Sequence, residues 1–282
     1  MARTRPRVVE TVSQLRGAVR GFRGEGAKVA LVPTMGALHA GHIALVRRAR
    51  EIAGRSVVSI FVNPTQFGPT EDFSRYPRTF EADLDKLADV GADLVYAPSA
   101  TEMYPQGFAT RIVVGGPSEG LETDFRPHFF GGVATVVAKL FIHATPDYAL
   151  FGEKDYQQLK VVTRLSRDLD LGVQVVGMPT IREADGLALS SRNAYLSAEE
   201  RATAPVIHHA LNGAAEMIRA GGDPSLATAQ ASERIAAAGL KVDYVAVRNA
   251  ETLAPLAASG EPVRLLAAAW LGTTRLIDNI PV

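Results

Sequence analysis

Short apolar runs that alternate with amphipathic segments are the feature that most limits the folds open to this chain. The pattern predicts five buried strands, at 29–32, 56–62, 94–97, 148–151 and 173–176. Amphipathic stretches such as 80–90 and 156–169 lie between them and are typical of helices. Strands that alternate with helices predict a parallel, doubly wound α/β sheet, and the unbroken hydrophobicity of each run fits burial on both faces.

The character of the sequence changes near Gly177–Pro179. Two helix-like stretches and three strand-like runs follow, at 198–220, 225–238, 244–247, 263–269 and 274–277. We therefore predict two domains, one over 1–179 and a smaller α+β domain over 180–282.

Composition excludes several classes of protein. The 282 residues include 30 basic and 30 acidic side chains, and this zero net charge gives no support to a nucleic-acid-binding surface. The chain has no cysteine, so disulfides and thiolate metal sites are excluded. The N-terminal stretch 1–7 is basic but has no apolar core behind it, and no apolar run approaches the length of a membrane span. We expect a cytoplasmic protein that binds neither nucleic acid nor membranes.

Two histidines lie at the turn from the first strand into a helix, within the segment Pro-Thr-Met-Gly-Ala-Leu-His-Ala-Gly-His at 33–42. Ligands of open α/β sheets bind at this edge, and a helix N-terminus offers N–H groups and a positive dipole end to phosphate. His39 and His42 are three residues apart, so their rings can share one face. Gly36 and Gly41 would let backbone and ligand approach closely. The alternative is a glycine-containing turn that carries two surface histidines.

The same segment resembles the His-x-Gly-His signature of the nucleotidyl-transferring superfamily that includes class I aminoacyl-tRNA synthetases. In those proteins the histidines contact the phosphates of ATP. The zero net charge argues against a tRNA-binding member. The signature alone therefore indicates nucleotidyl transfer and no particular substrate.

Three further polar segments follow strand-like runs, at 63–68, 152–158 and 181–193. The amides of Asn63 and Gln66 suit a small polar ligand. Lys154 would neutralise phosphate charge, and Gln158 lies one helical turn further on. Two hydroxyls and a guanidinium in the third segment would make an anion clamp. Each segment could also be a simple turn, a charged surface or a polar linker, but their shared position after strands favours one site.

The residues and the order of these segments resemble those of the pantoate–β-alanine ligase family, and the resemblance extends over nearly the whole chain. The most specific strings are Gly-Glu-Lys-Asp-Tyr-Gln-Gln at 152–158 and Asp-Gly-Leu-Ala-Leu-Ser-Ser-Arg-Asn at 185–193. The resemblance implies a Rossmann-like domain for nucleotide and pantoate, a C-terminal lid domain, and a homodimer. It also implies a reaction in which pantoate attacks the α-phosphorus of Mg-ATP. β-Alanine then attacks the pantoyl adenylate, which gives pantothenate and AMP.

The resemblance further implies roles for individual residues. His42 would be the proton donor, His39 would lie beside the phosphates, and Lys154 and Arg192 would complete the catalytic set. Contacts with pantoate and β-alanine are implied for Gln66, Gln158 and Asn63. Contacts with ATP are implied for Met35, Gly36, Ala37, Leu38, His39, Ala40, Gly41, His42, Gly152, Glu153, Lys154, Asp155, Ile181, Leu189, Ser190, Ser191 and Arg192.

The chain departs from the family pattern at two places. Members typically have Arg-Pro-Gly-His-Phe-Arg-Gly-Val where residues 126–133 are Arg-Pro-His-Phe-Phe-Gly-Gly-Val, so His128 stands one place early. We keep Arg126 and His128 as candidate pocket residues and expect a locally shifted loop to bring His128 to the pocket. Some members have an acidic pair where Ala82 precedes Asp83, which leaves Asp83 as the candidate magnesium (Mg2+) contact.

Two alternatives to the ligase stay open at this stage. The first is another His-x-Gly-His nucleotidyltransferase, which would keep the adenylyl group in its product where a ligase releases AMP. The second is a nucleotide-binding homologue without catalysis, and the altered segment 126–132 is its only support.

Overall fold

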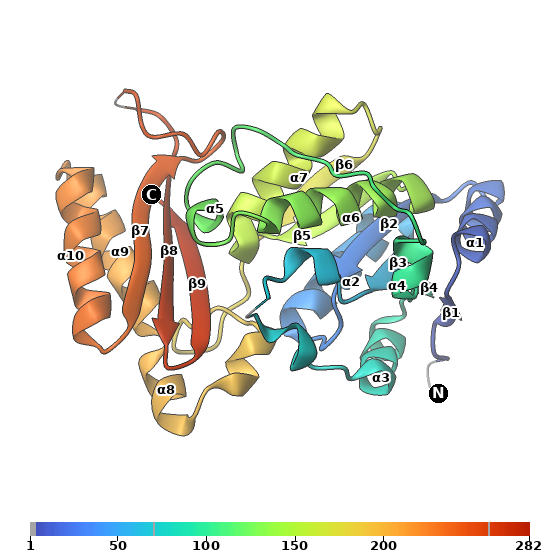
Figure 1. The fold of residues 1–282 in the computed structure, drawn as a ribbon, viewed down its shortest axis with the longest axis horizontal. Helices are drawn as coiled ribbons and strands as arrows, with labels where there is room; N and C mark the ends of the chain where they lie inside the picture. Colours follow the sequence, from blue (N-terminus) through green and yellow to red (C-terminus); the bar gives the residue numbers. More distant parts are fainter. Residues whose placement is uncertain (1–3, 70, 259) are drawn as a thin grey trace. The chain divides into compact units, whose positions relative to one another are not determined.

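The computed structural model describes residues 4–69, 71–258 and 260–282, and it divides into two compact units (Figure 1). The first unit comprises the described residues up to Val114 together with Arg126–Glu153 and Val161–Met178. The second comprises Gly115–Phe125, Lys154–Lys160 and Pro179–Val282. Part of the basic N-terminal stretch lies outside the described residues. The domain limit at 179/180 stays a prediction; the compact units assign two short segments from before it to the second unit.

A six-stranded parallel sheet forms the first unit, in the order β1-β4-β3-β2-β5-β6. Its elements are β1 (Arg7–Val9), α1 (Val12–Gly24), β2 (Lys28–Thr34), α2 (Ala40–Ala53), β3 (Gly54–Ile60), η1 (Pro64–Gln66), η2 (Asp72–Ser74), α3 (Phe80–Val90), β4 (Leu94–Tyr96), α4 (Ala100–Met103), α6 (Phe129–Ala144), β5 (Tyr148–Gly152), α7 (Tyr156–Asp168) and β6 (Gln174–Met178). The first residues of α7 belong to the second unit.

Helices pack on the sheet in two groups. α1 and α6 contact each other and β2, while α2 contacts α3 and packs on β2, β3 and β5. The apolar residues of β2, Val29 to Val32, are wholly buried, as the unbroken run predicted. The prediction of a Rossmann-like, doubly wound parallel sheet is therefore confirmed.

The order in which the chain adds strands to the sheet changes direction between β2 and β5, although the two strands are parallel. From β2 the chain moves to β3 and β4 on one side, and it later resumes with β5 and β6 on the other. Ligands of open α/β sheets bind beyond the carboxyl ends of the strands at such a reversal. The histidine segment follows β2 and Gly152 ends β5, so the topology brings these two strand ends to one place.

The second unit contains the antiparallel sheet β7-β8-β9, on which the packed helices α9 and α10 lie (Figure 1). Its elements are α5 (Glu122–Phe125), η4 (Ser191–Tyr195), α8 (Ala198–Thr203), α9 (Val206–Arg219), α10 (Pro224–Ala237), β7 (Lys241–Asn249), β8 (Val263–Leu271) and β9 (Thr274–Pro281). Leu211, Ile235 and Leu265 are wholly buried in its core. This unit is the α+β part that the sequence predicted.

Several predicted elements have different limits in the structure, and β1 was not among the five predicted strands. The alanine-rich stretch 198–220 is two helices, because Pro205 has no backbone N–H to continue α8 and its fixed φ suits the start of α9. β9 continues to Pro281, past the predicted end at 277. Asp278 and Asn279 break the apolar pattern there, yet both are buried and hydrogen-bonded.

Among the described residues, no helix combines the length and the hydrophobicity that crossing a bilayer requires.

A buried histidine links the stability of the first unit to pH. His143 on α6 is 7% exposed, and its Nδ1 lies 3.3 Å from the Tyr96 hydroxyl of β4. Burial lowers the pKa of His143 to about 4, and the positive charges of Lys139 and Arg16 act in the same direction. The unfolded chain, with a histidine pKa near 6.5, therefore binds this proton first as the pH falls.

We expect the free energy of unfolding to contain a contribution from His143 that is complete above pH 6.5 and is lost as the pH falls to about 4. A shift of this size corresponds to roughly 3 kcal/mol. His143→Gln keeps a polar partner for Tyr96 but does not titrate. Urea unfolding at pH 7 and at about pH 4.5 should therefore show a smaller loss of stability in the variant than in the wild type. Equal losses in the two proteins would contradict this assignment.

Candidate active site

The two histidines meet at the N-terminus of α2. His39 is the N-cap residue, and His42 lies in the first turn, with 4.1 Å between the two ring centroids. Nδ1 of His39 accepts a hydrogen bond from the Gly41 N–H, and Nδ1 of His42 accepts one from the His39 N–H. In the neutral form of each ring the proton must then sit on Nε2. Both rings therefore present an Nε2–H donor beside the positive end of α2.

The absence of a side chain at Gly41 makes room for the His39 ring. A β-carbon at this position would lie 2.9 Å from Cε1 of His39, closer than real β-carbons come. The sequence suggested that this glycine lets a ligand approach the backbone. In the structure it is the N-cap imidazole that occupies the space, which explains how His39 reaches the Gly41 N–H.

Asp83, at the start of α3, holds the loop that precedes the histidines. Its side chain is buried, and its carboxylate accepts hydrogen bonds from the N–H groups of Ala37 (2.9 Å) and Leu38 (2.8 Å). Thr79 donates a third, at 3.2 Å. Both oxygens are thus engaged by the chain itself, and the magnesium contact expected of Asp83 stays a prediction. Within 4–69, 71–258 and 260–282, no group of three or more His, Asp or Glu side chains could hold a metal ion.

The segment after β3 carries a buried amide pair. Asn63 is 1% exposed and Gln66 9%, and Nδ2 of Asn63 donates to Oε1 of Gln66 at 3.1 Å. Nε2 of Gln66 in turn lies 3.1 Å from Sδ of Met35. This contact joins the amide pair to the loop that leads to the histidines, so the first unit gathers these predicted site residues at one sheet edge.

The altered segment 126–133 comprises a short turn, 126–128, and the first residues of α6, which begins at Phe129. The apolar run from Phe129 continues into a long buried helix, and His128 takes the N-cap position. His128 Nε2 lies 3.6 Å from Oε1 of Glu71. Arg126 makes a bidentate ion pair with Glu71 and donates to the carbonyl of Gln66 at 3.3 Å, with its guanidinium 3.9 Å above the Phe129 ring. Both candidates thus lie beside the Gln66 segment, and Glu71, which nothing in the sequence singled out, connects them.

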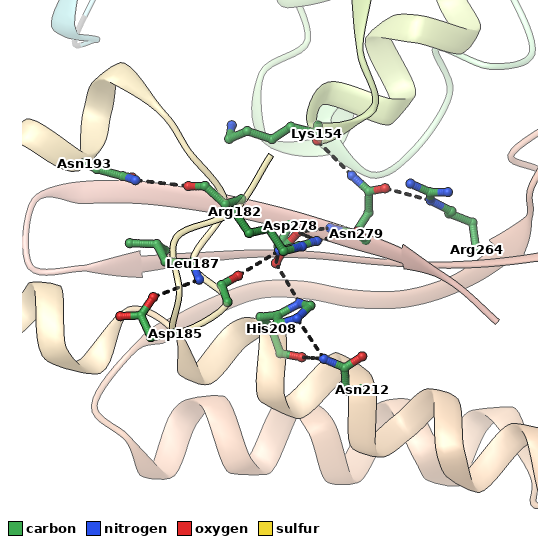
Figure 2. Close-up of polar contacts among 12 residues, drawn as sticks. Lys154, Arg182, Asp185, Leu187, Asn193, His208, Asn212, Arg264, Asp278 and Asn279 are labelled. Atoms are coloured by element: carbon green, nitrogen blue, oxygen red, sulfur yellow. Dashed lines mark hydrogen bonds and ion pairs between the residues drawn. The ribbon is translucent and has the colours of Figure 1, made fainter. Parts of the chain in front are cut away.

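The other predicted site residues lie in the second unit, apart from Gly152 and Glu153. η3 (Glu153–Asp155) follows β5, and the Lys154 side chain is 19% exposed, with Nζ 3.9 Å from Oδ2 of Asp155. Figure 2 shows Nδ2 of Asn279 donating to the Lys154 carbonyl at 2.8 Å, while Oδ1 of Asn279 accepts from Nε of Arg264 at 2.7 Å. β9 therefore positions the backbone that carries Lys154.

Gln158 is half-buried, whereas its neighbour Gln157 is buried and serves the fold. Oε1 of Gln157 accepts from the Glu122 N–H, and Nε2 donates to the carbonyls of Pro117 and Gly120. The two consecutive glutamines thus have different roles. Gln157 fastens the segment Gly115–Phe125, and Gln158 is the one left as a candidate for substrate.

β9 also anchors the segment 181–193, which the sequence predicted to bind phosphate. Arg182 forms a bidentate ion pair with Asp278 at 2.7 and 2.9 Å and also donates to the Asn279 carbonyl, as Figure 2 shows. Burial raises the pKa of Asp278, but His208, 3.6 Å away, and Arg182 outweigh this effect and hold the pKa below its usual value. Asp278 is therefore a stable anion that fixes Arg182.

Beyond Arg182 the backbone N–H of Leu189 donates to the Ile181 carbonyl at 2.9 Å. Ser190 caps η4, where its hydroxyl accepts from the Arg192 N–H at 3.3 Å. Nδ2 of Asn193 donates to the Ala188 carbonyl at 3.0 Å. Ser191 and Arg192 thus lie on a short, internally braced turn. The sequence did not single out Asp278 and Asn279; their signal is a polar pair between the apolar residues Ile277 and Ile280.

Comparison with known proteins agrees with this architecture. The family model described as pantoate-beta-alanine ligase matches residues 7–281. A pantothenate synthetase of a Bradyrhizobium species is 60% identical over 284 residues, which cover 100% of each chain. The crystal structure of pantothenate synthetase from Thermus thermophilus is 50% identical, with a TM-score of 0.91 over 97% of this chain and 98% of that one.

A pantoate-beta-alanine ligase from Francisella tularensis, solved in complex with beta-gamma ATP and beta-alanine, is 32% identical. Its TM-score is 0.82, with 98% of this chain and 97% of that chain covered. Matches of this extent, on the fold and the motif-bearing segments described above, establish that the chain belongs to the pantoate–β-alanine ligase family.

Proposed function

We propose that this protein condenses pantoate with β-alanine and converts ATP to AMP and pyrophosphate in the process. The observation that carries the proposal is the pair His39 and His42, whose Nε2–H donors lie at the N-terminus of α2 where the sheet order reverses. Membership of the family and a relative solved with ATP and β-alanine support the choice of substrates.

Adenylation is the step that these residues suit. A carboxylate is a poor acylating group, so the pantoate carboxylate must first attack the α-phosphorus of ATP and displace pyrophosphate. Negative charge then grows on the phosphates, and fixed N–H donors and cations stabilise it. We assign the two imidazoles to this task as hydrogen-bond donors through Nε2, and the proton-donor role of His42 stays an expectation from the family resemblance. Lys154 and Arg192 of the second unit supply positive charge.

The remaining candidates hold the reactants. We assign ATP contacts to the loop from Met35 to Gly41, to Gly152, Glu153 and Asp155, and to Ile181 with the segment Leu189–Ser191. Gln66 and Gln158 hold pantoate, and Gln66 also lies near β-alanine. The β-alanine amine attacks the carbonyl of pantoyl adenylate, and AMP leaves. No covalent enzyme intermediate is needed. Holding the two reactants in line supplies much of the rate enhancement, because it makes a bimolecular step effectively unimolecular.

Magnesium is proposed to arrive with the nucleotide. Mg2+ is commonly bound by substrate phosphates, water and few carboxylates, and Asp83 is occupied by backbone N–H groups. A homodimer stays a prediction from the family resemblance, and a cytoplasmic location stays a prediction from the sequence composition.

The order of steps is open to a direct measurement. Pantoate alone should support exchange of labelled pyrophosphate into ATP, because adenylation needs no amine, while AMP release should require β-alanine as well. Exchange that β-alanine supports without pantoate would contradict this order. A product that retains the adenylyl group would indicate a nucleotidyltransferase instead.

Loss of one charge-stabilising donor should slow adenylation. We expect His42→Ala and Lys154→Ala each to lower the exchange rate by at least ~10²-fold, with folding retained because both side chains are only half-buried. Exposed His209 on α9 and Lys28 at the amino end of β2 offer matched controls, and His209→Ala and Lys28→Ala should leave the rate within about twofold, as surface changes usually do. Near-normal exchange in either site variant would refute the role assigned to that residue.

A further inference from the structure

The orientation of the Asn63 amide is determined by two backbone groups. Oδ1 of Asn63 accepts from the Thr65 N–H at 3.3 Å, and Nδ2 donates to the Gly132 carbonyl at 3.2 Å. A backbone N–H can only donate and a carbonyl can only accept, so the amide cannot be turned round. Gly132 allows this approach, since a β-carbon there would lie 2.4 Å from the Thr65 carbonyl oxygen.

The orientation of Asn63 dictates that of Gln66. Nδ2 of Asn63 faces Gln66 at 3.1 Å and needs an acceptor there, so Oε1 of Gln66 must point toward Asn63. Nε2 of Gln66 therefore points the other way, toward Sδ of Met35 at 3.1 Å. A thioether is only a weak acceptor. The amide of Gln66 thus offers the pocket a donor that a ligand oxygen satisfies better than the sulfur does.

Tyr104, which follows α4, completes this chain of contacts. Its hydroxyl lies 2.8 Å from Oδ1 of Asn63 and must donate, because that oxygen only accepts. Burial raises the pKa of Tyr104, against a smaller lowering by Thr65, so the phenol keeps its proton at neutral pH. The ring packs edge-on against Phe108, with 5.1 Å between centroids, which holds the hydroxyl in place.

We propose that Tyr104 is a positioning residue. The backbone groups set which way the Asn63 amide faces, and the Tyr104 hydroxyl fixes where that amide lies, so that Asn63 holds the NH2 group of Gln66 directed into the pocket. The substrate atom that Gln66 receives is then an acceptor, the carboxylate or hydroxyl oxygen of a hydroxy acid, and an amine is disfavoured at that position. This inference rests on the proposed function, because Gln66 is assigned to pantoate there.

The test is Tyr104→Phe, which removes the hydroxyl and keeps the ring. In pantoate-dependent pyrophosphate exchange, KM for pantoate should rise about fivefold to tenfold, the effect of one hydrogen bond, while KM for ATP stays within about twofold. Tyr148→Phe is the matched control, since its hydroxyl contacts Lys28 at the amino end of the sheet. It should change neither KM. An unchanged KM for pantoate in Tyr104→Phe, or equal rises for both substrates, would overturn the proposal.

A double-mutant cycle separates positioning from a general structural effect. If Tyr104 acts through Gln66, adding Tyr104→Phe to Gln66→Ala should leave KM for pantoate where Gln66→Ala alone puts it. Effects that multiply independently would overturn the proposal. Wild-type exchange is measured first, because its absence refutes the ligase function itself, whereas normal wild-type exchange with a silent Tyr104→Phe refutes only the inference on Tyr104.

Discussion

The parallel pairing of β2 with β3 on one side and with β5 on the other is the constraint on which the first unit depends. β2 is buried on both faces, and its register places Thr34 beside Ile60 and Leu31 beside Ala149. Three strand ends therefore lie at one edge of the sheet. The histidine segment and the Asn63 segment follow two of those ends and Gly152 forms the third, so the candidate site in this unit is a consequence of strand order and register.

Polar groups at that edge are held by other polar groups before any ligand binds. Asp83 binds the backbone before His39, each imidazole Nδ1 binds a backbone N–H, and Asn63 binds Thr65 and Gly132. Such contacts remove the alternative orientations of a side chain. Donors that are already aligned need not reorganise when charge develops on a phosphate, which is the main source of electrostatic catalysis.

The second unit uses buried ions for the same purpose. Arg182, with a side chain 19% exposed, pairs with Asp278 at 5%, and Asn279 connects this pair to the backbone of Lys154. Replacing a buried ion pair by apolar residues is often neutral for stability, whereas removing one partner is strongly destabilising. The role of this pair is therefore to fix geometry. Together with Asn279 it holds the segments that carry Arg182 and Lys154 against β9.

The sequence by itself determined the class of fold and the location of the candidate site. Continuous apolar runs and amphipathic periods report local burial, so the parallel sheet, α3 and the strand-to-helix position of His39 and His42 could all be predicted. Specific strings such as that at 152–158 identified the family. These signals lie within a few neighbouring residues.

Tertiary structure alone decided how the site residues are held. Asp83 carries a carboxylate, the kind of group that binds metal ions. Its hydrogen-bond donors, the N–H groups of Ala37 and Leu38, are 46 and 45 residues away in the chain. Asp278 and Asn279 come directly after the predicted strand 274–277. Their hydrogen-bond partners, Arg182 and Lys154, are 96 and 125 residues away. Hydrogen bonds over such separations leave no periodic pattern in the sequence, because the partners meet only after the sheets have formed.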